Sequence, residues 1–117
     1  MKIKTSELLG PVLNWAVARA DDYDEEWLAR QLKNPNPYTR CIPEFSTDWD
    51  EGGPIIEREK ISVGYERNSA PQGCLWDAVK PGGTALYLEY GSTPLIAAMR
   101  CYVASKLGDE VEIPDGL

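Results

Sequence analysis

The chain has 117 residues, the length of one domain, and its 43% apolar and 26% charged residues are typical of a globular protein. Its net charge of −7 disfavours nucleic acid as a partner, because binding to a polyanion depends on Lys and Arg side chains. The absence of histidine removes the commonest general base and metal ligand, so we expect a non-catalytic protein without a metal or another cofactor.

Two helices are expected in the first third of the chain. In "GPVLNWAVARADD", Pro11 suits a first helical position, and apolar residues recur at spacings of three and four. In "YDEEWLARQLKN", acidic residues occupy the first turn and Lys33 the last, which complements the helix dipole. Pro35 and Pro37 then predict the end of the second helix.

Strands broken by glycine and proline are expected between residues 41 and 90, with candidates at residues 54–66, 74–80 and 84–90. The last two flank "PGG", which predicts a hairpin with a short loop. Within the second of these strands, Leu86 and Leu88 alternate with Tyr87 and Glu89, so one face of the sheet should be buried.

A final helix is expected over residues 94–107. Ser92 or Thr93 supplies the N-cap, Pro94 the first helical position and Gly108 the stop, and an apolar stripe should pack on the sheet. The stripe consists of Leu95, Ala98, Met99, Tyr102 and Val103. The predicted fold class is therefore α+β, a small antiparallel sheet covered on one face by the N-terminal and C-terminal helices.

The acidic residues 109–117 are expected to form a loose tail of the single domain that spans residues 1–117. Val111 and Ile113 alternate within it, as in a short edge strand. Cys41, Cys74 and Cys101 are odd in number and widely spaced, which indicates reduced thiols without a metal.

The stretch "STDWDEGGPIIERE", residues 46–59, is the strongest candidate for a functional site. It is interpreted as a glycine loop that enters a strand at Ile55. Trp49 would offer a stacking surface, the glycines backbone donors and Arg58 a fork for a phosphate or carboxylate. The alternative is an ordered connection in which Trp49 closes the core.

The N-terminus of the final helix is the second part of this predicted site, because free backbone N–H groups and the helix dipole attract anions. A well-capped helix without a ligand explains the same residues. The candidate ligand-binding residues are Ser46, Thr47, Asp48, Trp49, Gly52, Gly53, Arg58, Ser92 and Thr93. Glu57 and Glu59 would lie on one face of a strand, more economically a solvated face than an acid–base pair.

Three blocks, "KTSELLGPVLNWAVARADD", "STDWDEGGPIIERE" and "GSTPLIAAMRCYVASKLGDEV", together resemble the NinX-like family of small bacteriophage proteins, a domain of unknown function. The resemblance implies a phage accessory protein in the cytoplasm of the infected bacterial host, and it supplies no active site. The sequence agrees with that location, since it has no secretory signal at its start and no apolar stretch of 18 residues.

Two classes of function follow. The first is a binder that sequesters a small anionic, nucleotide-like ligand, such as a host defence signal, through residues 46–59 and the last helix. The second is a protein-interaction module that inhibits a host protein through an acidic or tryptophan-containing surface. A concave pocket that unites Trp49, Gly53, Arg58 and Thr93 would favour the first, and a flat exposed patch the second. We also expect a homo-oligomer, because the sheet has an uncovered face and an edge strand near residues 84–90.

Overall fold

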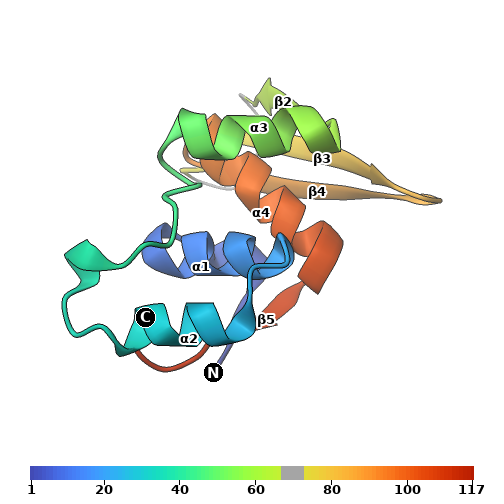
Figure 1. Ribbon diagram of the computed structural model, residues 1–117. Helices are drawn as coiled ribbons and strands as arrows, with labels where there is room; N and C mark the ends of the chain where they lie inside the picture. The colour runs from blue at the N-terminus through green and yellow to red at the C-terminus, as the bar shows by residue number, and fades with distance from the viewer. Residues whose placement is uncertain (67–72) are drawn as a thin grey trace.

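The computed structural model describes residues 1–66 and 73–117 (Figure 1). Its helices are α1 (Gly10–Ala20), α2 (Glu25–Lys33), α3 (Trp49–Glu59) and α4 (Pro94–Leu107), with 3-10 turns η1 (Thr5–Glu7) and η2 (Pro37–Thr39). Its strands are β1 (Lys2–Lys4), β2 (Ser62–Tyr65), β3 (Trp76–Gly82), β4 (Ala85–Gly91) and β5 (Glu110–Glu112). The predicted α+β class is confirmed.

Helix α4 is the centre of the fold, and its predicted bounds are confirmed. The Thr93 hydroxyl accepts the Ile96 N–H at 3.1 Å, and Gly108 ends the helix with a φ of 90°. The expected single apolar stripe was too narrow, because every residue from 95 to 104 is buried. Helix α4 lies on strands β3 and β4 and is flanked by α1 and α3, so three of its sides face protein (Figure 1).

The three-stranded sheet is antiparallel in the order β2-β3-β4. The predicted hairpin is confirmed, with Gly82 opposite Ala85 and Gly83 at a φ of 70° in the turn. Helix α4 covers one face of this sheet, and α1 lies on the other side of α4 (Figure 1). The expectation that helices cover one face therefore holds through α4, on which α1 packs as a further layer.

The interpretation of residues 46–59 as a loop followed by a strand is wrong. Residues 49–59 form helix α3, and the next strand begins only at Ser62. The Asp48 carboxylate caps this helix by accepting the Asp50 N–H at 2.9 Å, and Lys60 ends it with a φ of 55°. Glu57 and Glu59 consequently lie on a helix and not on a strand.

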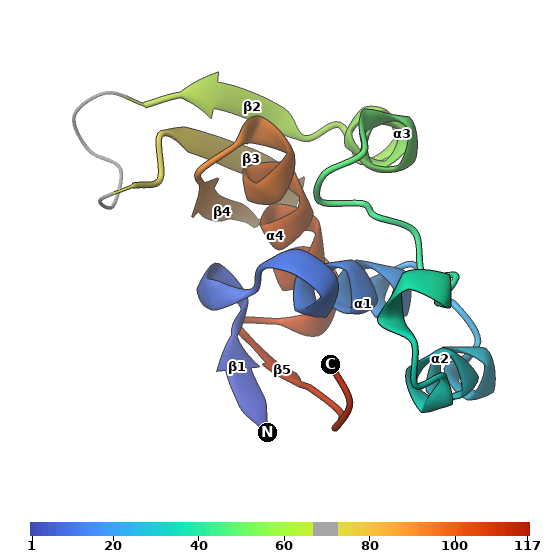
Figure 2. The same cartoon turned by 90° about the vertical axis from the view of Figure 1, so that its left-hand side faces the viewer.

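The second sheet pairs β1 with β5 and joins the two ends of the chain. Val111 and Ile113 are buried, as their alternation indicated, and the Thr5 hydroxyl donates to the Gly108 carbonyl at 2.6 Å. Figure 2 shows this ribbon at the opposite end of the molecule from the β2–β3–β4 sheet. Within residues 1–66 and 73–117, no helix is long and apolar enough to cross a membrane.

Candidate functional site

The residues before helix α3 have structural roles. Ser46 is buried, and its N–H and hydroxyl both donate to the Asn14 side-chain oxygen, at 2.9 Å and 2.7 Å. This pair fixes the start of α3 against α1. Thr47 is exposed, and Asp48 serves as the N-cap described above. Ser46 is therefore part of the core of the fold, where its N–H and hydroxyl are already paired with Asn14.

Trp49 and Arg58 occupy opposite ends of helix α3. A helix rises 1.5 Å per residue, so about 13 Å of axis separates them. Trp49 is 55% exposed, which contradicts the alternative in which it closes the core. A Cβ atom on Gly53 would lie 3.8 Å from the Trp49 ring, so the indole lies along its own helix. The two predicted anchors therefore do not lie together on one loop, as the interpretation of residues 46–59 assumed.

Arg58 is held in an ion-pair network. Its guanidinium contacts the Asp21 carboxylate at 2.8 Å and the Glu59 carboxylate at 2.9 Å, and it donates to the Tyr102 hydroxyl at 3.2 Å. The hydrogen bond from Arg58 lowers the pKa of Glu59, although burial opposes that shift. Lys80 of β3 lies 3.7 Å from the other Glu59 oxygen. The network connects α3 to α1, to α4 and to the sheet.

Gly52 allows helices α3 and α4 to approach closely. It is buried, and a Cβ atom at this position would collide with the Phe45 carbonyl and the Leu95 side chain. Its N–H donates to the Asp48 carbonyl at 2.9 Å, so it is not a free donor for an anion. The pattern that the sequence presented as a glycine loop is explained here by helix packing.

Neither of the two cavities found among the described residues unites Trp49, Gly53, Arg58 and Thr93. Ser92 is exposed, and the Thr93 hydroxyl caps α4. A cavity of about 380 Å³ next to η2 reaches Asp48, and none of Trp49, Gly53, Arg58 and Thr93 lines it. The structure thus separates the predicted site residues into a cap, a packing contact, an ion-pair network and an exposed tryptophan.

The sequence predicted an uncovered sheet face, and the structure shows which residues form this open face of the β2–β3–β4 sheet. Directly paired residues share a face, so Leu88 lies beside Val79 and Leu86 beside Pro81. Leu86 is 67% exposed and Leu88 is 49% exposed. The alternation along β4 was predicted, but it does not say which side is covered. Ala78 of the central strand is fully buried on the opposite side, against α4, so the leucines are on the open side.

Strands β2, β3 and β4 place one charged side chain on this open face. We define the open face by the strand residues Ser62, Gly64, Asp77, Val79, Pro81, Leu86, Leu88 and Tyr90. Asp77 has no ion-pair or hydrogen-bond partner within the described part of the chain. A Cβ atom on Gly64 would lie 3.1 Å from its carboxylate, so the glycine leaves room for Asp77 on the face.

The covered face differs in its polar chemistry. Glu89 lies on that side, and burial raises the pKa of its carboxyl. Arg100 of α4 donates to the Leu8 and Tyr90 carbonyls, both at 2.8 Å. The Tyr90 carbonyl therefore already has a partner, which shortens the length of β4 available to a further strand.

The family model described as Bacteriophage P22, NinX, matches residues 4–106, which is most of the chain. The match covers α1, α3, the whole β2–β3–β4 sheet and all of α4 except its last residue. A search of curated proteins found no match.

Proposed function

The chain belongs to the bacteriophage NinX family and is a phage accessory protein, and we propose that it acts by binding another protein through the open face. The observation that carries the proposal is the exposure of Leu86 and Leu88 side by side with further apolar residues on a regular sheet. Contiguous exposed apolar surface on a small protein marks an interaction site more often than scattered exposed residues do.

The energetics of the open face support a protein partner. Complete burial of a leucine side chain contributes about 1.5–3 kcal/mol. Because Leu86 and Leu88 are roughly half or more exposed, about half or more of that contribution is still available when a partner covers them. A flat sheet face offers no enclosure for a small molecule, whereas it matches a helix or a second sheet. The partner therefore presents an apolar segment of similar length to β3 and β4.

The charges of the chain and of its open face indicate which side chains the partner carries. The chain carries a net charge of −7, and the strands place Asp77 as the single charged group on the open face. An acidic group inside an apolar interface needs a counter-charge, because an unpaired buried carboxylate is costly. We propose that the partner segment is apolar and carries a Lys or Arg that meets Asp77. A second copy of the chain would bring the same acidic face and the same net charge.

The hypothesis that the protein binds a nucleotide-like anion has less support than the proposed protein partner. Arg58 is engaged by Asp21 and Glu59, and Trp49 lies at the far end of the same helix. We retain from the sequence the proposals that the protein is not an enzyme and that it acts in the cytoplasm of the infected host. Inhibition of a host protein is a further proposal, which relies on the phage origin of the family.

The proposal is tested by recovering the tagged protein from infected cells and quantifying the proteins that accompany it. Leu88→Lys places a cation on the open face, and Leu9→Lys makes the same change at an exposed leucine before α1. We expect a protein that accompanies the wild type and Leu9→Lys and is reduced at least about tenfold with Leu88→Lys. Circular dichroism would confirm that both variants fold.

A set of accompanying proteins that is equal for both variants would contradict the proposal. Sedimentation equilibrium of the pure protein tests whether a second copy of the chain covers the open face. Self-association that Leu88→Lys abolishes and Leu9→Lys preserves would assign the face to the expected homo-oligomer instead of a foreign partner.

A further inference from the structure

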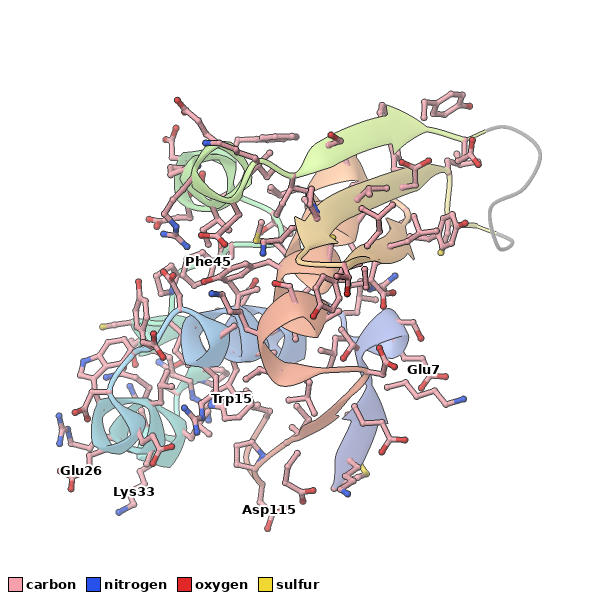
Figure 3. The ribbon with its side chains drawn as sticks, turned by 90° about the vertical axis from the view of Figure 1, so that its right-hand side faces the viewer. Glu7, Trp15, Glu26, Lys33, Phe45 and Asp115 are labelled. Atoms are coloured by element: carbon pink, nitrogen blue, oxygen red, sulfur yellow. The ribbon has the colours of Figure 1, made fainter. Side chains whose placement is uncertain are left out.

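A cavity of about 370 Å³ lies between α1, α2 and the chain that follows β5, far from the open face. Its volume falls within the range of small-molecule sites. Its apolar lining consists of Trp15, Leu28, Ala29, Leu32 and Pro114, and its polar lining of Arg19, Glu25, Lys33 and Asp115. Figure 3 shows Trp15 on α1, Lys33 at the end of α2 and Asp115 on the tail, on different sides of this region.

The Trp15 side chain contributes an unpartnered donor. Trp15 is only 8% exposed, and its indole N–H has no hydrogen-bond partner among the described residues. No fully buried side-chain nitrogen or oxygen in that part of the chain lacks a partner, so the indole nitrogen must be reached by solvent. Trp15 lines this cavity, so its free indole N–H belongs to a residue that an entering ligand would contact.

The charges around the cavity favour an anion at one rim. Arg19 and Glu25 form an ion pair, so they largely neutralise each other. Lys33 has no acidic partner among the described residues, and it lies in the last turn of α2. Asp115 lies on the tail, and its negative charge would weaken the binding of an anion nearby. The free donors are thus the indole N–H and the Lys33 ammonium.

We propose that this cavity binds a small apolar carboxylate. The apolar body, of about one ring or a branched chain, would lie on Trp15, Leu28 and Leu32, and the carboxylate would accept from the Trp15 N–H and Lys33. The site is independent of the open face, so it stands or falls separately from the proposed protein partner. It is also distinct from the nucleotide-like ligand expected at residues 46–59.

The test is an NMR titration that follows the Trp15 indole N–H signal with three probes of equal body, 3-phenylpropionate, 3-phenylpropan-1-ol and 3-phenylpropylamine. We expect the carboxylate to shift this signal and to bind more tightly than the alcohol or the amine. Lys33→Gln should weaken carboxylate binding about two- to fivefold, and Asp115→Asn should strengthen it about twofold. Lys106→Gln, in the last turn of α4, is the matched control and should change nothing.

Ala29→Phe tests the place of binding, because Ala29 lines the cavity and is exposed, so the larger ring fills the space without entering the core. We expect it to abolish the shift while the variant stays folded by circular dichroism. Tighter binding of the amine, undiminished binding to Ala29→Phe, or no shift with any probe up to about 10 mM would each overturn the proposal.

Discussion

Helices α3 and α4 are in contact, yet only α4 could be predicted as a helix from its own sequence. Helix α4 has a hydroxyl cap, Pro94 at its start and Gly108 after its end, and its bounds follow from these local signals. Helix α3 contains Gly52, Gly53 and Pro54 in its interior, which predicted a turn. Local sequence signals determine where a helix forms when they agree with each other. When they conflict, tertiary packing can determine whether the segment is helical.

The tertiary contacts of α3 outweigh a poor intrinsic tendency to be helical. Two interior glycines cost about 1 kcal/mol each and an interior proline about 3 kcal/mol relative to alanine. Against this stand the Asp48 cap, the burial of Ile55, the close approach at Gly52 and the ion pairs of Arg58. The comparison therefore predicts that α4 depends on its buried side chains and α3 on a few specific contacts.

The largest effect is expected from Met99→Ala in α4. Met99 is fully buried at the centre of the fold, so the change should leave a cavity and lower the free energy of unfolding by about 2–5 kcal/mol. Urea denaturation measures this difference. Leu88→Ala on the open face is the control and should cost far less, and a loss below about 0.5 kcal/mol for Met99→Ala would contradict the central place of α4.

The two glycines of α3 should respond in opposite ways. Gly52→Ala inserts a methyl group against the Phe45 carbonyl and Leu95, and we expect it to lower the free energy of unfolding by about 1–3 kcal/mol. Gly53→Ala meets only the Trp49 ring, at 3.8 Å, and it should raise stability by about 0.5–1 kcal/mol through helix propensity. Equal effects of the two substitutions in thermal and chemical unfolding would remove the packing explanation of Gly52.

The sequence predicted the parts of the fold whose signals are local. These are the first two helices, the hairpin around Gly83 and the bounds of α4. It failed where the reason for a residue lies on another element. Gly52 is explained by Leu95 of α4, far along the chain, and by the carbonyl of Phe45, which directly precedes the pattern that suggested a loop. Strand β1 has three residues and depends on β5, at the other end of the chain.

The candidate site was predicted less well than the fold, for the same reason. The chemical types at Trp49, Arg58 and Thr93 suit an anion, but type alone does not bring side chains together. Alternation along β4 suggested one buried face, and the burial of Ala78 and the packing of Tyr87 against the core show that Leu86 and Leu88 are on the other face. An exposed leucine and a core leucine look identical in a sequence.

A smaller effect, with a defined pH dependence, is expected from Arg58→Ala. The side chain is 49% exposed, so solvent screening limits the loss to about 0.5–1 kcal/mol near neutral pH. Arg58 lowers the pKa of Glu59 in the folded state, and this contribution is present above the unfolded pKa of Glu59 and is lost as pH falls through the folded value. Unfolding free energies of both proteins between about pH 3 and pH 7 should therefore converge at the acidic end. A constant difference across that range would show that Arg58 acts by packing alone.

The smallest effect is expected from Trp49→Ala, because the indole is 55% exposed and lies along its own helix against Gly53. The substitution should change the free energy of unfolding by about 0.5 kcal/mol or less, since exposed side chains outside specific contacts have little influence on stability. Measured beside Arg58→Ala in one series of thermal melts, this variant tests whether the start of α3 serves the fold or is free for a ligand. A loss of about 3 kcal/mol or more would mean that Trp49 belongs to the core after all, and α3 would then resemble α4 in depending on buried side chains. If Trp49→Ala leaves the free energy of unfolding unchanged, α3 does not depend on this side chain in the way that α4 depends on its buried residues. The large aromatic surface at the start of α3 would then have to be covered by a molecule other than the chain itself.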